Sequence, residues 1–148
     1  MSRRERETLS KGKAVKMSVH GSRSLGDERV RIIILEEIEK NKVDLIVTHG
    51  EPGGVCEMAR QICKEKAIPL LLHFLNFKYL RGAFERRSKA VLEDSDVGLF
   101  IHDGESRGTQ NEMILAKKMN VRAITHMVKP EEHKKSVGFP IEEEWGDG

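Results

Sequence analysis

Residues 97–127 read VGLFIHDGESRGTQNEMILAKKMNVRAITHM, and this stretch decides the fold. It opens with the apolar run Val97–His102, typical of a buried strand, and continues through the polar loop Asp103–Gly108. A helical pattern from Thr109 to Met119 follows, and a second strand pattern covers Val121–Met127. A strand, a helix and a second strand at this spacing form a βαβ unit. The stretch therefore predicts a parallel sheet with helices packed on it.

The same alternation extends over most of the chain. Further strand patterns cover Ala14–His20, Asp44–His49 and Ile68–Phe74. Helical patterns cover Glu28–Lys40, a segment opened by Gly53-Gly54, and about Gly82 to Glu93. Asp27 has the right side chain and position to cap the first of these helices. We therefore predict an α/β fold, with a central parallel sheet of about five strands covered by helices on both faces.

Length and charge limit the classes of function. The chain has 148 residues, enough for one domain with its own core, and 26 Lys+Arg against 24 Asp+Glu give a net charge of +2. That balance argues against a protein that mainly binds nucleic acid through its phosphate backbone. The ends differ, since residues 1–16 carry six basic and two acidic residues, net +4, and residues 131–148 carry two basic and six acidic residues, net −4. We predict a basic flexible arm over 1–13, one domain over 14–130 and an acidic tail over 131–148.

The cysteines and the apolar runs favour a cytoplasmic protein. No apolar run approaches the ~20 residues that cross a bilayer, and no apolar segment follows the charged N-terminus as in a signal peptide. Cys56 and Cys63 lie seven residues apart on one predicted helix, roughly 10 Å along its axis, which is too far for a disulfide. We therefore expect no membrane partner.

One predicted helix has an unusually wide apolar face. The helix is Glu28–Lys40, and its apolar residues are Val30, Ile32, Ile33, Ile34, Leu35 and Ile38. A face this wide can pack on the sheet and on a second subunit at once. We therefore predict a homo-oligomer formed through this helix.

Three loops follow the carboxyl ends of strands, where open parallel sheets bind ligands. The first holds Gly21, Ser22 and Arg23; in the second, Gly53-Gly54 opens a helix whose amides favour an anion. In the third, Gly108 and Thr109 stand where another helix begins. Each loop also has a purely structural interpretation. The first two are also typical of tight turns, and Thr109-x-x-Glu112 matches a capping box.

Taken together, five segments resemble one superfamily. They are Gly21-Ser22-Arg23, Gly53-Gly54-Val55-Cys56-Glu57-Met58-Ala59, Arg86-Arg87-Ser88-Lys89, Asp94-Ser95-Asp96 and Ser106-Arg107-Gly108-Thr109. As a set they resemble the SLOG superfamily, which contains the "lonely guy" phosphoribohydrolases and the DNA-processing protein DprA. The resemblance covers about residues 15–126. It implies a three-layer Rossmann-like fold with strand order 3-2-1-4-5.

The resemblance also implies a nucleotide or nucleotide-derived ligand. Its binding residues would be Gly21, Ser22, Arg23, Gly53, Gly54, Ser106, Arg107, Gly108 and Thr109. In the phosphoribohydrolases a Pro-Gly-Gly-x-Gly-Thr-x-x-Glu motif supplies a catalytic glutamate, which matches Glu112 here. Arg86 or Arg87 would then be the catalytic arginine, and the reaction would cleave an N-glycosidic bond.

This chain departs from that motif before Gly108. Gly104-Glu105-Ser106-Arg107 replaces Pro-Gly-Gly-x, and Asp103 precedes it, so two acids enter a loop that should hold phosphate. That weighs against hydrolysis and points to a small uncharacterised branch of the superfamily, thought to sense or bind nucleotide-related ligands. We therefore expect a nucleotide-binding or sensor protein. The alternatives are a nucleotide N-glycosidase and, through the basic arm, a single-stranded DNA-binding module.

The histidines and two aromatic residues have competing interpretations. Five histidines end or nearly end predicted strands: His20, His49, His73, His102 and His126. Parallel strands would bring them to one edge, but strand side chains alternate between faces and no metal-binding spacing is present. We predict hydrogen-bonded or packed histidines, with no metal and no other cofactor. Phe77 or Tyr79 could stack on a base or belong to the core. Cys56 could be a reactive or a buried thiol.

Overall fold

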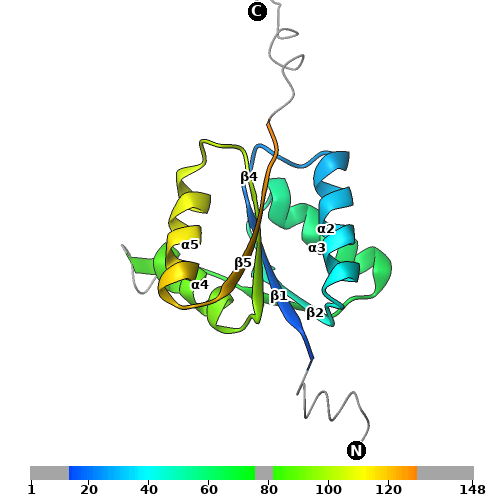
Figure 1. Ribbon diagram of the computed structural model, residues 1–148, viewed down its shortest axis with the longest axis horizontal. Helices are drawn as coiled ribbons and strands as arrows, with labels where there is room; N and C mark the ends of the chain where they lie inside the picture. Colours follow the sequence, from blue (N-terminus) through cyan, green and yellow to red (C-terminus); the bar gives the residue numbers. More distant parts are fainter. Residues whose placement is uncertain (1–13, 76–81, 130–148) are drawn as a thin grey trace, which may run out of the picture.

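The five predicted strands form one parallel sheet in the computed structural model, which describes residues 14–75 and 82–129 (Figure 1). The strands are β1 (Lys16–Gly21), β2 (Leu45–His49), β3 (Leu70–His73), β4 (Val97–His102) and β5 (Arg122–Met127). Their order is β3-β2-β1-β4-β5. The predicted α/β class and the strand order are therefore confirmed.

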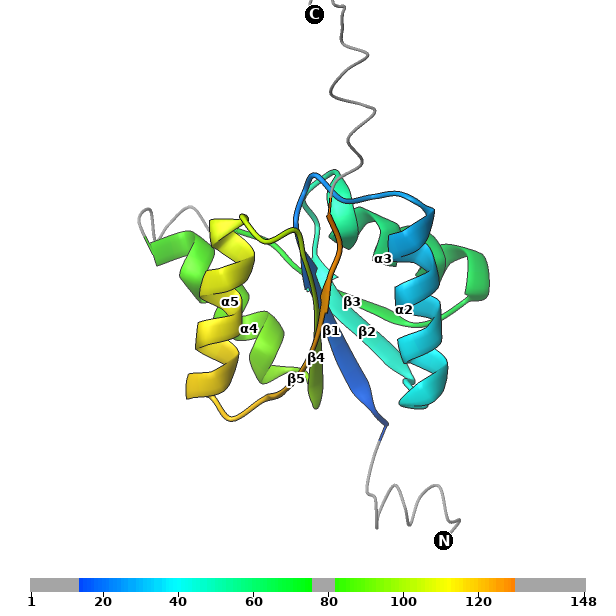
Figure 2. The same cartoon turned by 45° about the horizontal axis from the view of Figure 1, so that its top comes forward.

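Four helices alternate with the strands among the described residues. They are α2 (Glu28–Lys40), α3 (Gly54–Lys66), α4 (Ala83–Glu93) and α5 (Arg107–Lys118). Helices α2 and α3 cover one face of the sheet, and α4 and α5 cover the other (Figures 1 and 2). Asp27 caps α2 as predicted, since its side chain accepts a hydrogen bond from the Arg29 amide. The result is a three-layer, Rossmann-like arrangement.

The two faces of the sheet are chemically different. The larger apolar core lies on the α2/α3 face and includes Met17 and Val19 of β1. On the α4/α5 face the buried apolar cluster is smaller and includes Phe100. Because strand side chains alternate, β1 directs Ser18 and His20 to this second face, where the His20 ring stacks on Phe100 with centroids 4.4 Å apart. Polar groups are thus buried on the α4/α5 side only a few ångströms from the core.

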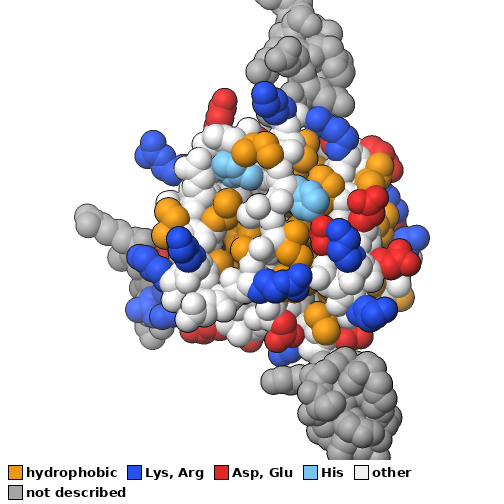
Figure 3. Space-filling model, in the orientation of Figure 1, with side chains coloured by type: hydrophobic (Ala, Val, Ile, Leu, Met, Phe, Trp, Pro, Cys, Tyr) orange, Lys and Arg blue, Asp and Glu red, His pale blue; other side chains and the backbone are white. Residues whose placement is uncertain are grey.

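Among residues 14–75 and 82–129, no further strand pairs with β5 at one edge of the sheet. β5 is an edge strand, and its residues alternate between exposed and half-buried, with Met127 63% exposed. Figure 3, in the orientation of Figure 1, shows hydrophobic side chains at the surface between charged ones on this face.

The wide apolar face of α2 is mostly covered within the chain. Val30 and Ile34 are fully buried, Ile33, Leu35 and Ile38 pack against the core, and Ile32 is 47% exposed. The homo-oligomer through this helix remains a prediction.

The predicted arm over 1–13 and the tail over 131–148 lie outside the described residues, and so does the DNA-binding alternative that depends on the arm. Within residues 14–75 and 82–129, no helix is both long and apolar enough to cross a bilayer.

One glycine allows the loop after β1 and the start of α3 to touch. Gly54 opens α3 with φ +71°, and a Cβ atom there would lie 2.4 Å from the Arg23 Cα. The Val55 amide beside it donates to the Ser22 carbonyl at 3.3 Å. Gly54 therefore has a backbone role that any larger residue would disrupt.

We expect Gly54→Ala to lower the free energy of unfolding by roughly 2–5 kcal/mol, from left-handed backbone strain and steric overlap. Urea denaturation followed by circular dichroism measures this. Gly108→Ala is the matched control, because a Cβ at Gly108 meets nothing within 4 Å and lies in a helix, where alanine is favoured. Equal stability of the two variants would contradict the role given to Gly54.

Candidate functional site

A cavity of about 770 Å³ opens at the carboxyl edge of the sheet. Its walls come from the end of β1 and the loop after it, the loop after β2, the start of α3, and helices α4 and α5. This is where ligands bind in open parallel sheets, beside β1, at which the strand order reverses.

Most of the predicted site residues line this one cavity: Gly21, Arg23, Gly53, Arg87, Ser106, Gly108, Thr109 and Glu112. Four do not line it. Arg86 and Arg107 are exposed outside it, Gly54 lies behind Gly53, and Ser22 is buried between β4 and α3, with its carbonyl accepting from the Val55 amide. Of the two candidate arginines on α4, only Arg87 faces the cavity. The catalytic and binding roles of all these residues remain predictions.

The start of α5 differs from the predicted capping box. The helix begins at Arg107, two residues earlier than predicted, and Ser106 is the N-cap, accepting from the Thr109 amide at 3.4 Å. Thr109 therefore lies within the helix. The Glu112 side chain points away from the start of the helix. The capping-box interpretation of Thr109 and Glu112 is wrong, because a serine three residues before Thr109 provides the cap.

The first turn of α5 carries no acidic residue, so its amides and dipole favour an anion in the cavity. The two loop acids do not oppose this. Asp103 accepts from the amides of Glu105 and Ser106, both at 2.8 Å, and from the Ser24 hydroxyl at 3.0 Å. Burial alone would raise its pKa, but these hydrogen bonds hold the pKa of Asp103 below its usual value. Neither Asp103 nor the exposed Glu105 lines the cavity, so the acids of this loop do not face a bound anion.

The start of α3 is a weaker anion site than the sequence suggests. The amide of Gly53, the N-cap residue of α3, donates to the carboxylate of Glu57. A carboxylate of the chain itself therefore already occupies the position that a phosphate would take there.

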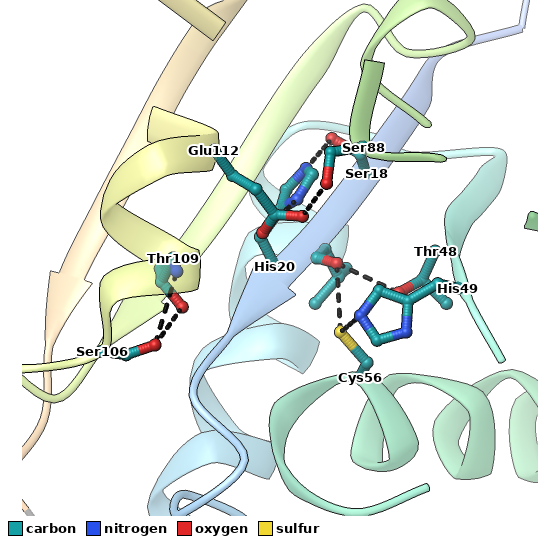
Figure 4. A network of polar contacts seen from close by, with 10 residues as sticks. Ser18, His20, Thr48, His49, Cys56, Ser88, Ser106, Thr109 and Glu112 are labelled. Carbon is teal, nitrogen blue, oxygen red and sulfur yellow. Dashed lines mark hydrogen bonds and ion pairs between the residues drawn. The ribbon is translucent and has the colours of Figure 1, made fainter. Parts of the chain in front are cut away.

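Glu112 is the most enclosed acid of the cavity wall. Its Oε2 accepts from the Ser88 hydroxyl at 2.8 Å, and its Oε1 lies 3.2 Å from His20 Nδ1. His20 Nε2 in turn lies 2.8 Å from the hydroxyl of Ser18, which is fully buried (Figure 4). Burial by itself would raise the pKa of Glu112, but the contacts with His20 and Ser88 outweigh it and hold that pKa well below its usual 4.5. Glu112 therefore faces the cavity as a fixed carboxylate.

A second pair, the half-buried His49 and the buried Cys56, lies on the α3 side of the cavity (Figure 4). His49 Nε2 is 3.2 Å from Cys56 Sγ, and His49 Nδ1 accepts from the Glu51 amide at 3.3 Å. Burial, aided by the Arg87 charge, lowers the pKa of His49 to about 4, and burial raises the pKa of the Cys56 thiol to about 11. Both groups are neutral near pH 7. Of the two interpretations of Cys56, the structure favours the buried thiol.

Two arginines share one acid at the mouth of the cavity. Glu51 Oε2 accepts from Arg87 Nη1 at 2.7 Å, and Glu51 Oε1 accepts from Arg23 Nη2 at 2.9 Å. The Arg87 side chain is only 7% exposed, and its Nε has no hydrogen-bond partner among the described residues. Burial opposes ionisation of Glu51, but the two arginines lower its pKa. The guanidinium of Arg87 also lies over the Phe84 ring, 5.3 Å from its centroid.

The lining is balanced in charge, with Arg23, Arg87 and Lys118 against Glu51, Glu85 and Glu112. The apolar part is formed by Phe84, Ile114 and Leu115. The sequence did not single out Phe84. The two aromatic residues that it offered for stacking or for the core, Phe77 and Tyr79, lie outside the described residues. Glu51 was missed as well, although its position directly after the β2 end was a usable signal.

The strand-end histidines do not converge. His20 pairs with Glu112 and His49 with Cys56, whereas His73 pairs with Asp94 at 2.6 Å and His126 with Glu37 at 2.9 Å. His102 accepts from the Gly104 amide at 3.1 Å. Among residues 14–75 and 82–129, no group of three or more histidine, cysteine or acidic side chains is arranged to hold a metal ion.

Comparisons with known proteins leave the family open. No protein-family model matches the chain, and no curated protein and no solved structure matches it at a significant level. The fold and the site thus define a class only: a Rossmann-like α/β protein with a polar cavity at the carboxyl edge of its sheet.

The lowered pKa of Glu112 predicts acid sensitivity. The stabilisation from this carboxylate is complete above pH 4.5 and is lost as the pH falls toward the lowered pKa, because the unfolded chain binds the proton first. We expect the free energy of unfolding of the wild type to fall with a slope of up to about 1.4 kcal/mol per pH unit from this group. Glu112→Gln should remove that part of the slope, and Ser88→Ala should reduce it. Urea titrations between pH 6 and 3 test this, and an unchanged slope in Glu112→Gln would contradict it.

Proposed function

We propose that the protein binds a small nucleotide-like ligand in this cavity and acts as a binding or sensor protein. One observation carries the proposal. The same cavity holds a helix N-terminus without acids and a buried arginine whose Nε has no partner among the described residues.

The phosphate of such a ligand would lie at the start of α5. Gly108 offers open space there, and the Thr109 hydroxyl and the first amides of the helix can donate to phosphate oxygens. Arg87 supplies positive charge from α4, and charge-assisted hydrogen bonds of this kind are stronger than neutral ones. The Arg23 side chain is long and exposed at the rim of the cavity, so it can change its conformation to contact a bound ligand.

The base would lie against the apolar part of the wall. Phe84 is 55% exposed and Ile114 56% exposed, although both line a cavity. Large apolar side chains left open in a recess are typical of ligand sites, and an aromatic ring there can stack on a base. The ribose would then be near Glu112 and Ser88, which can hydrogen-bond to its hydroxyls.

The first test is thermal denaturation with a panel of nucleoside mono- and diphosphates. A ligand at about 100 times its Kd adds about 2.7 kcal/mol to the stability, a shift of several degrees in Tm. We expect Arg87→Gln to raise the Kd of the ligand at least tenfold, because a charge-assisted hydrogen bond is lost. The thermal shift of the variant is measured from its own ligand-free Tm.

Arg86→Gln is the control for that variant, since Arg86 is its neighbour on α4 but does not line the cavity. It should bind like the wild type. Absence of a shift with every nucleotide would overturn the proposal, and equal losses in the two variants would overturn the role of Arg87.

Glu112 favours a second candidate, an N-glycosidase. A carboxylate held ionised at the cavity wall can stabilise the positive charge that develops on ribose as the bond to the base breaks. Water then adds to the ribose carbon, giving a free base and ribose 5-phosphate. His20 and Ser88 would act as positioning residues that fix the carboxylate.

This candidate predicts release of base from a nucleoside monophosphate, detected by chromatography. Glu112→Gln should lower the rate by roughly 100-fold or more, because the amide cannot stabilise the developing charge. Glu65→Gln is the control, since Glu65 pairs with Arg31 outside the cavity. If the wild type binds nucleotides but releases no base, the glycosidase candidate fails and the binding protein remains.

A further inference from the structure

We infer that Glu51 is an internal competitor for the ligand's anionic group, and that binding displaces its carboxylate from Arg87 and Arg23. This rests on the proposed function in one respect: the anion is taken to be the phosphate of the nucleotide-like ligand. No other part of the argument depends on the identity of the ligand.

The geometry of the three groups carries the inference. Both oxygens of Glu51 accept from a guanidinium, at 2.7 Å from Arg87 and 2.9 Å from Arg23. All three residues line the cavity. The pair of arginines with a carboxylate between them is the arrangement in which proteins bind a carboxylate or phosphate from outside. Here the chain supplies the anion itself.

Burial explains why an internal anion is needed. The Arg87 side chain is 7% exposed, and a buried guanidinium without a counter-ion is costly. In the free protein Glu51 supplies the negative charge. A bound phosphate would take over this function.

Position explains why Glu51 is the group that moves. Arg87 lies within α4, while Glu51 lies in the short loop between β2 and α3 and is 21% exposed. Arg23 is in a loop as well, and its side chain is 72% exposed. Rotation of the Glu51 side chain toward solvent requires no helix to shift. A ligand therefore binds by exchanging one anion for another.

The exchange also sets the specificity of the site. An isolated small anion gains little binding free energy, because it only replaces the contacts that Glu51 already makes with the two arginines. A ligand whose phosphate also contacts the start of α5, or whose base contacts Phe84, gains more than it displaces. The cavity thus selects against inorganic phosphate and in favour of a phosphate attached to a larger aromatic group.

The test compares Glu51→Gln with Glu85→Gln. Both remove one negative charge from the same cavity lining, but Glu85 forms no ion pair with the described residues. Thermal denaturation is measured with inorganic phosphate, against sodium chloride at equal ionic strength. We expect phosphate to stabilise Glu51→Gln clearly more than Glu85→Gln or the wild type, and without phosphate Glu51→Gln should have the lowest Tm of the three.

Adenosine 5′-monophosphate is then titrated into the same proteins. Removal of the competitor should raise the affinity of Glu51→Gln about tenfold over the wild type. A lower affinity would mean that Glu51 positions Arg87 for the ligand, and equal gains in the two variants would mean a general effect of charge; either result overturns the inference. If phosphate stabilises Glu51→Gln selectively but no nucleotide binds any form, the proposed function fails and the competitor remains.

Discussion

The Glu112 carboxylate, half-buried at the cavity wall, is the interaction on which the α4/α5 half of the molecule depends. It joins α5 to Ser88 of α4 and, through His20, to β1 beneath them. Removing one partner from such a group leaves an uncompensated charge and costs about 3–5 kcal/mol. The small apolar cluster on this face, around Leu92, Phe100 and Ala116, has less hydrophobic area than the opposite core to compensate such a loss. The position of the two helices, and with it the shape of the cavity, is therefore fixed by a polar contact.

A second polar cluster connects the remaining walls of the cavity. Unlike the first cluster, it lies mostly near solvent. Glu51 joins Arg87 of α4 to Arg23 in the loop after β1, and two of its three members lie in loops near solvent. The Gly54 contact brings these loops together without a side chain between them. One cluster is enclosed and holds its geometry, while the other can rearrange without disturbing the core. The proposed binding site would require both properties, and different residues around the same cavity would provide them.

The periodicity of the sequence was sufficient for the fold and for the edge at which the site lies. The strand Val97–His102 was predicted with its observed ends, because apolar runs and turn residues are local signals. The direction in which each side chain points could not be predicted from the sequence. His73 and His126 end strands as predicted but turn to Asp94 and Glu37, since that choice depends on which neighbouring helix offers a partner. Likewise, Thr109 and Glu112 fit a capping box by spacing. Only the competing cap at Ser106 and the partners of Glu112 on α4 and β1 decide otherwise.

Charge balance inside the cavity narrows the kind of ligand that it can hold. Three basic and three acidic side chains line it, and the two acids of the loop before α5, Asp103 and Glu105, do not. A single strand of nucleic acid places a phosphate at every nucleotide, so its repeated charges would meet Glu85 and Glu112 as well as the arginines. A ligand with its phosphate confined to one end avoids that repulsion. Its uncharged sugar can lie beside Glu112, and its base can cover Phe84. The near-neutral composition of the chain and the balance of its cavity thus favour the same ligand: small, anionic at one end and aromatic at the other.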